Sequence, residues 1–180
     1  MTLYALILFL HLTGVVALFL AFGIEWAAIS FLVSANSAAE AQAWLRLGRL
    51  GPLINGPALL LVILSGGYLA SIINVFKQGW IPASFIGIAV VAALGVAINV
   101  PKMRAIRLAI PKGGDALSTA LRTKLLPVSV RLRTFAALGI VFMMVAKGPF
   151  GASMLALLAG LFLGLLLCIP VVTRKSATPH

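Results

Sequence analysis

Two ionisable side chains lie in the first long apolar stretch of the sequence, where charged groups are costly and usually functional. His11 stands eight residues beyond Leu3, which places it ~12 Å along a helix and near the middle of a ~30 Å hydrocarbon layer. Glu25 follows fourteen residues later, and fourteen helical steps of about 100° bring it back to within ~40° of His11. We therefore expect both side chains on one helix face, with Glu25 near the cytoplasmic boundary.

The same face carries three small residues, which allow a neighbouring helix to approach closely: Gly14, Ala17 and Ala21. It is therefore predicted to point into a helical bundle, where His11 has two interpretations. The histidine either makes one interhelical hydrogen bond, or it ligates a cofactor or metal. The candidate hydrogen-bond partners are Ser65, Tyr68 and Asn99.

Glu25 is expected to be a structural partner of Arg46 or Arg49 at the cytoplasmic interface, with the role of proton carrier as the alternative. The chain contains three acidic residues in all, which argues against paired-carboxylate catalysis and against cation sites built from several carboxylates. Met143 and Met144 offer thioether sulfurs that suit a soft metal such as copper beside His11. Methionines in an apolar helix also serve simply for packing.

The composition predicts that the elements carrying these residues are membrane helices. Hydrophobic residues make up 62% of the 180-residue chain and charged residues 9%, against about 25% charged in soluble domains. Runs of roughly 20 apolar residues cross the bilayer, and they must be helical because lipid offers backbone groups no hydrogen-bond partner. We predict an all-α integral membrane bundle of five spans, a four-helix core plus one. The single domain covers 1–175, with a disordered tail at 176–180 and spans at 3–24, 53–75, 81–100, 128–146 and 152–172.

The connections carry further expectations. The first helix should continue through 27–33, and Ser34–Leu50 should form a short polar helix that ends at Gly51–Pro52. Glycines and prolines from Gly51 to Pro57, around Asn55, predict an irregular start to the second span, which would line a cavity or kink for packing.

Two expectations concern the segment 101–133. Asp115 should cap a short helix in the membrane interface, with Leu117, Leu121 and Leu125 on one face. The fourth span reaches full length only if Arg131 and Arg133 lie in its first turns, where long side chains extend to the headgroups.

The basic residues predict the orientation. Of the 14 lysines and arginines, all but Lys77 and Lys147 fall in segments that share one side of a five-span topology. Basic residues stay in the cytoplasm, so the N-terminus is predicted outside and the C-terminus inside. This clustering between apolar runs also excludes nucleic-acid binding in favour of the lipid bilayer as partner. Gly160 and Gly164 form a G-x-x-x-G pair. It fits packing within the chain, or contact with another molecule, either a second copy or another partner in a membrane complex.

Three stretches resemble a group of bacterial inner-membrane families. They are Leu10–His11–Leu12–Thr13–Gly14, then Arg46 and Arg49 followed by Pro57 and Ser65–Gly66, and then Arg133 to Ala146–Lys147–Gly148–Pro149–Phe150. The closest resemblance is to an uncharacterised predicted integral membrane family, and it extends to copper-resistance D-like proteins and haem-associated membrane protoporphyrinogen oxidases. It covers roughly residues 3–150.

The resemblance implies a bacterial inner-membrane location and makes His11 a candidate ligand of haem b. The only other histidine is His180, so a second axial ligand would be a methionine or come from another subunit. The favoured function is a non-enzymatic membrane or accessory subunit. A haem-binding redox protein and a copper-handling protein are the alternatives.

Overall fold

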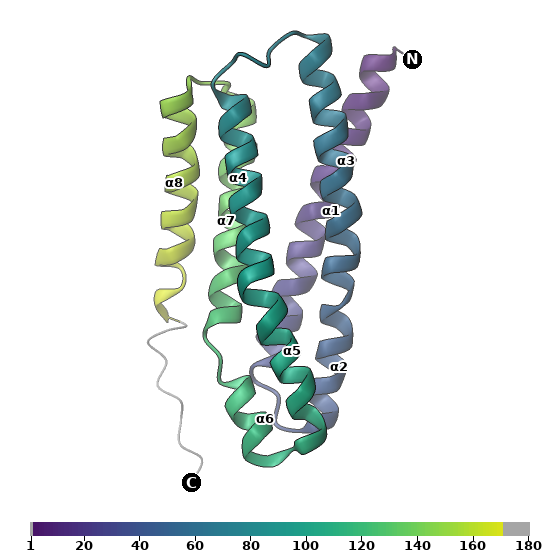
Figure 1. Cartoon of the computed structure of the whole chain (residues 1–180), viewed down its shortest axis with the longest axis vertical. Coiled ribbons are helices and arrows are strands. Elements are labelled where there is room, and N and C mark those ends of the chain that lie inside the picture. Colours follow the sequence, from purple (N-terminus) through teal and green to yellow (C-terminus); the bar gives the residue numbers. More distant parts are fainter. Residues whose placement is uncertain (1, 171–180) are drawn as a thin grey trace.

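The computed structural model describes residues 2–170, and these form helices without any strand. This confirms the all-α prediction. Figure 1 shows long helices running along one axis. The elements are α1 (Leu3–Leu32), α2 (Ala38–Gly48), α3 (Leu50–Ile72), α4 (Trp80–Leu94), the π-helix η1 (Gly95–Asn99), α5 (Val100–Ala109), the 3₁₀ turn η2 (Ile110–Lys112), α6 (Gly114–Leu121), α7 (Leu125–Ala146) and α8 (Phe150–Leu166).

Four helical segments within the described residues are long and apolar enough to cross a membrane: Leu3–Leu32, Ala38–Ile72, Trp80–Lys112 and Gly114–Ala146. The first extends well beyond Ile24, as the sequence predicts. The fifth predicted span corresponds to α8, which is apolar but has 17 residues. The end of that span at residue 172 and the predicted tail at 176–180 lie outside the described residues.

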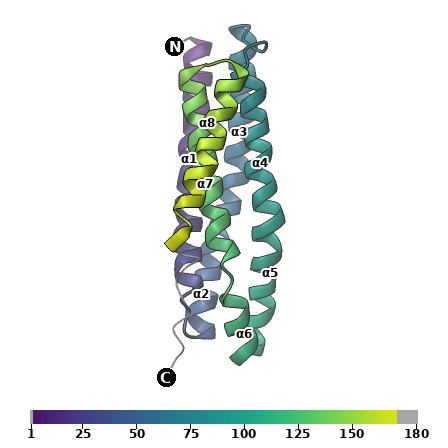
Figure 2. The ribbon, with the colours of Figure 1, turned by 90° about the vertical axis from the view of Figure 1, so that its left-hand side faces the viewer.

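The long helices form two groups. Helix α1 packs along α3, whereas α7 packs along both α4 and α8, and α1 and α7 join the groups. The N-terminus shares one end of the bundle with the α3–α4 and α7–α8 connections, and α2, α5 and α6 lie at the other end (Figures 1 and 2). The end that holds α2, α5 and α6 is called the basic end below, because it carries most of the lysines and arginines.

The start of the second span differs from the prediction. Helix α2 passes into α3 with only Arg49 between them, and α3 continues through Pro52 and Pro57. Pro52 lies in the first turn of α3, where backbone N–H groups have no partner within the helix, so a proline there removes no hydrogen bond. The irregular first turn expected from Gly51 to Pro57 is therefore wrong, whereas Pro57 lies inside α3 and a kink for packing there stays a prediction.

A hydrophobic core closes the basic end. Ile29, Leu32, Leu45, Ile106 and Leu126 are buried there, together with Leu117 and Leu121 of α6. Helix α6 therefore packs onto the bundle through Leu117 and Leu121, two of the three predicted leucines. The third, Leu125, begins α7 and is exposed. Its N-cap is Gly113, whose φ of 60° suits glycine, and Asp115 lies in the first helical turn instead of capping it.

The G-x-x-x-G pair of α8 packs within the chain. A Cβ atom at Gly160 would meet the carbonyl oxygen of Phe135, and one at Gly164 would lie 3.3 Å from the Arg131 oxygen. Both glycines thus bring α8 against the backbone of α7. Of the two alternatives for this motif, intrachain packing is the one observed, and a homo-oligomer stays a prediction.

This contact predicts the effect of one added methyl group. Gly160→Ala should lower the free energy of unfolding by about 1–3 kcal/mol, because the new atom overlaps the α7 backbone. Gly151→Ala in the same helix is the control, since a Cβ atom there meets nothing within 4 Å. Thermal unfolding of the purified protein in detergent measures both variants. Equal melting temperatures for the two would contradict the packing.

Candidate functional site

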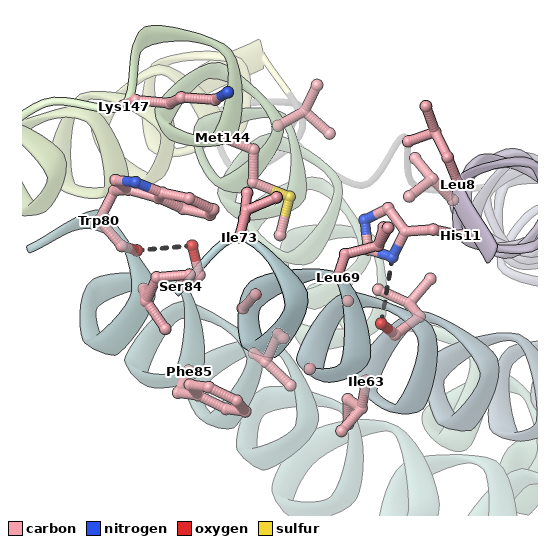
Figure 3. A pocket seen from close by; sticks show the side chains of 18 of the residues that line it. Leu8, His11, Ile63, Leu69, Ile73, Trp80, Ser84, Phe85, Met144 and Lys147 are labelled. Atoms are coloured by element: carbon pink, nitrogen blue, oxygen red, sulfur yellow. Dashed lines mark hydrogen bonds between the residues drawn. The ribbon is translucent and has the colours of Figure 1, made fainter. Parts of the chain in front are cut away.

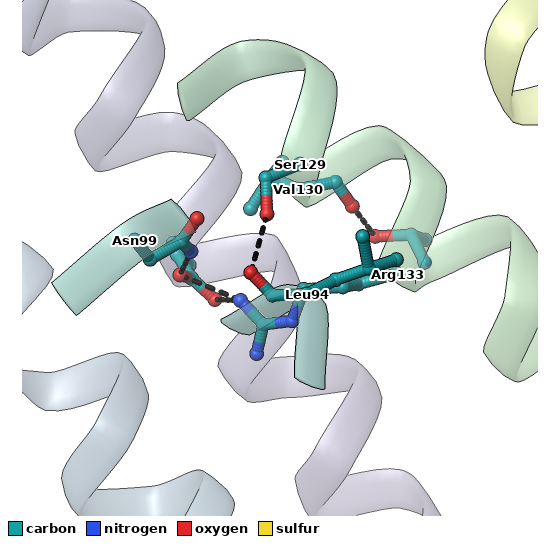
Figure 4. A network of polar contacts seen from close by, with 7 residues as sticks. Leu94, Asn99, Ser129, Val130 and Arg133 are labelled. Carbon is teal, nitrogen blue, oxygen red and sulfur yellow. Dashed lines mark hydrogen bonds and ion pairs between the residues drawn. The ribbon is translucent and has the colours of Figure 1, made fainter. Parts of the chain in front are cut away.

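A buried ion pair joins the two helix groups. Glu25 of α1 and Arg133 of α7 are each 5% exposed, and Arg133 Nη1 lies 2.9 Å from both carboxylate oxygens. Asn99, the last residue of the π-helix, donates from Nδ2 to Glu25 Oε1. Figure 4 shows this network at the meeting point of three chain segments. Removing either partner of a buried ion pair leaves the other charge uncompensated, so each residue depends on the other.

The guanidinium of Arg133 is enclosed by the π-helix and by α1. A Cβ atom at Gly95 would lie 3.2 Å from Arg133 Cζ, and the Phe22 ring centroid is 5.2 Å from the same atom. Ser129, one turn before Arg133, donates a hydrogen bond of 3.3 Å to the Leu94 carbonyl. The π-helix therefore supplies both a glycine surface for the guanidinium and the Asn99 amide for the carboxylate. Such local widenings of a helix often occur at functional sites.

Arg133 keeps unused hydrogen-bond donors. A guanidinium carries five N–H groups, and the hydrogen bonds of Arg133 to Glu25 all start at Nη1. Arg133 Nε is buried without a partner, as is Asn99 Oδ1. The pair is thus neutral in total charge but not saturated in hydrogen bonding.

These contacts correct two expectations for the charged residues. Arg46 and Arg49 are exposed at the basic end, and Glu25 pairs with Arg133 instead. Arg133 does not extend to a headgroup region, because α1 offers it a carboxylate at its own level. Arg131 lies over the Trp26 ring, with Cζ 5.1 Å from the centroid, so it too packs on the protein.

A cavity of about 340 Å³ opens toward the end that holds the N-terminus, between α1 and α3 on one side and α4 and α7 on the other. Its lining is mostly apolar, and the residues with polar side-chain groups are Tyr4, His11, Trp80, Ser84 and Lys147. Figure 3 shows His11 on one wall, with Trp80, Met144 and Lys147 on the other side of the cavity. A volume of this size lies in the range of small-molecule sites.

The hydrogen bonds of His11 fix its tautomer. His11 Nδ1 lies 3.2 Å from the Val62 carbonyl oxygen, which can only accept, so Nδ1 carries the proton. The same nitrogen is 3.2 Å from Ser65 Oγ, whose hydroxyl donates to the Leu61 carbonyl. The predicted interhelical bond from His11 to Ser65 is therefore confirmed, and Nε2 keeps a free lone pair for a ligand.

The structure separates the two candidate methionines. Met144 lines the cavity with His11, whereas Met143 is 1% exposed in the core between α4, α7 and α8. Met143 is therefore a packing residue, and Met144 is the thioether that shares a cavity with the histidine. Among residues 2–170, no group of three or more His, Cys, Asp or Glu side chains is placed to hold a metal ion.

A smaller second cavity of about 80 Å³ lies deeper in the bundle. Asn55 and Arg133 line it together with Phe19 and Phe22, so it reaches the ion pair. Asn55 thus takes a place in a cavity wall, while Pro57 is exposed on the outside of α3. Sequence analysis did not find Arg133 as a site residue, although a basic side chain inside a predicted span was the available signal.

Comparisons with known proteins give no match for this chain among family models, curated proteins or solved structures.

The ion pair predicts a non-additive pair of substitutions. Glu25→Leu should lower the free energy of unfolding by about 3–5 kcal/mol, because it leaves Arg133 buried without its counter-charge. The double variant Glu25→Leu, Arg133→Leu should recover most of this loss. Denaturant unfolding in detergent measures both.

Asp115→Asn, at an exposed position, is the matched control for loss of one acidic charge and should cost less than about 1 kcal/mol. A double variant less stable than Glu25→Leu alone would show that Glu25 and Arg133 do not depend on each other.

Proposed function

We propose that this chain is a multi-pass protein of the bacterial inner membrane, with its N-terminus outside and its basic end in the cytoplasm. The separation of charge along the bundle carries the proposal. Helices α2 and α5 and the residues that flank α6 carry exposed arginines and lysines at one end, whereas Lys77 and Lys147 follow α3 and α7 at the other. Membrane proteins keep their positively charged segments in the cytoplasm.

The outward surfaces of the helices support a lipid environment. Large apolar side chains stand exposed along the outer faces of the long helices, among them Phe9, Val16, Leu64 and Phe142. The buried charges, by contrast, face inward and are paired with each other, as Glu25 and Arg133 are. A surface that is apolar all around a helical bundle is stable in hydrocarbon and not in water. The location in the bacterial inner membrane follows the sequence resemblance.

The role proposed first is a non-enzymatic one, as a membrane or accessory subunit. The ionisable groups in the interior form an ion pair that joins helices, and such a pair serves structure directly. The chain would then act by binding a small molecule or another membrane protein.

Cysteine accessibility tests the orientation. In a Cys168→Ser background, Lys77→Cys should react with a membrane-impermeant maleimide on intact bacterial cells. Lys112→Cys should react only after the cells are permeabilised, because it lies at the basic end. The reverse pattern, with Lys112→Cys labelled from outside and Lys77→Cys protected, would invert the proposed topology.

Haem or copper binding is the second candidate, and one observation favours it. The free Nε2 of His11 and the thioether of Met144 line the same cavity. A histidine and a methionine are an established axial pair for haem, and both atoms suit Cu(I). These two residues would hold the group, and the cavity would shield it from water.

This candidate predicts a spectrum and a metal content. Protein produced in haem-replete cells should show a Soret band that His11→Ala abolishes and Met144→Leu shifts. Copper retained after loading and washing should follow the same pattern by mass spectrometry. Met143→Leu is the control, since Met143 is buried outside the cavity. Wild-type protein with neither a Soret band nor retained copper would exclude both groups.

A further inference from the structure

The two cavities adjoin. One lies toward the outer end of the bundle, and the other reaches Arg133 of the ion pair. They share five lining residues, which form their common boundary: Val15, Val62, Ile88, Val141 and Met144. Helices α1 and α3 provide one wall and α4 and α7 the other. Trp80 and Lys147 line the outer cavity, and Arg133 lines the inner one.

The inner end of this space offers hydrogen-bond donors without net charge. Arg133 lines it and is 5% exposed. Its Nη2 group makes no hydrogen bond to the described residues, whereas Nε is fully buried beside Gly95. Asn55 lines the same cavity with a side-chain amide. A buried donor that stays unpaired costs about 1–3 kcal/mol. A ligand oxygen that accepts from Nη2 therefore satisfies a donor that the described residues leave unpaired.

The charge balance decides which acceptor fits. Glu25 already neutralises Arg133, so a ligand carboxylate or phosphate would bring a second, uncompensated negative charge into an apolar region, at high cost. A neutral carbonyl oxygen accepts the same hydrogen bond and adds no charge. Phe19 and Phe22 line the inner cavity beside Arg133, which suits a flat ring next to that carbonyl.

We propose that the joined cavities bind an uncharged, elongated apolar molecule that carries a carbonyl oxygen at one end, the chemistry of a quinone with a hydrocarbon chain. The carbonyl accepts a hydrogen bond from Arg133, and the chain extends past Val141 and His11 toward Trp80. The proposal rests on the proposed membrane location, because such a molecule reaches the cavity from the bilayer. Binding to purified protein in detergent is independent of that location and of the orientation of the chain.

Tryptophan fluorescence provides the measurement, because Trp80 lines the outer cavity. Decylubiquinone is titrated into the full chain in detergent micelles, and quenching is expected to contain a saturable component. Trp80→Phe should remove that component, whereas quenching of Trp26 and Trp44 by quinone dissolved in the micelle should stay linear. Dodecylbenzene, which has a chain and a ring but no carbonyl, and palmitate, which has a carboxylate, are tested as competitors.

Substitutions test separately whether the ligand occupies the cavity and whether it accepts a hydrogen bond from Arg133. Val141→Phe fills the boundary between the cavities and should abolish saturable quenching, while Leu138→Phe adds the same ring to an exposed position of α7 and should not. Val15→Phe fills the same boundary from α1 and replaces Val141→Phe if that variant does not fold. Arg133→Lys keeps the charge for Glu25 but removes the guanidinium donors, and it should weaken quinone binding about tenfold or more.

The proposal requires that dodecylbenzene bind much more weakly than the quinone in the wild type. In Arg133→Lys, the two molecules should bind with similar affinity. Quenching that is linear in the wild type, or unchanged in both cavity-filling variants, would overturn it. Relief of the saturable quenching by palmitate at lower concentrations than the quinone itself requires for binding would assign the site to an anion instead. Unaltered affinity in Arg133→Lys would show that the inner donors do not contact the ligand.

Discussion

The ion pair between Glu25 and Arg133 is the constraint on which the rest of the bundle depends. Neither charge is stable at this depth without the other, so α1 and α7 must meet at one register, with the carboxylate against the guanidinium. The pair also fixes the third segment. Asn99 reaches Glu25, and Gly95 gives the guanidinium a surface without a side chain, which requires the π-helical turn between α4 and α5.

The same junction explains where the bundle is open. At the basic end, leucines and isoleucines of α1, α2, α5, α6 and α7 form a buried hydrophobic core. Toward the end that holds the N-terminus, side chains of α1 and α3 and of α4 and α7 line a cavity that they do not fill. The cavity is therefore a consequence of helices that converge on one buried contact. His11 belongs to its wall because the bond to Ser65 holds it on α3.

Much of this architecture follows from the sequence because hydrocarbon admits few solutions. The apolar runs predict the helices, the extension of α1 to Leu32 and the leucine face of α6. The bond from His11 to Ser65 was one of three candidates, and it could be anticipated because a polar group in an apolar face needs a nearby partner. Which of the three lies beside His11 depends, however, on how the helices are placed in register, and the structure gives Ser65.

The remaining features depend on three-dimensional placement that periodicity does not contain. An arginine near the start of a helix can either extend to water or form half of an ion pair. For Arg133, the position of Glu25 along α1 decides between the two. Pro52 is harmless because α3 begins just before it. Met143 and Met144 are neighbours in sequence, yet one helical step of about 100° sends one into the core and the other into the cavity.

The balance of charge and hydrogen bonding at the pair gives the interior its binding character. Glu25 cancels the charge of Arg133 but leaves several of its N–H groups without acceptors. The deep end of the cavity therefore favours a neutral acceptor, whereas the free lone pair of His11, nearer the mouth, favours an electron-deficient centre such as a metal. These two chemistries lie at different depths along one passage. A molecule held by Arg133 and a metal held by His11 would thus occupy neighbouring parts of the same space, and each would restrict the room left to the other.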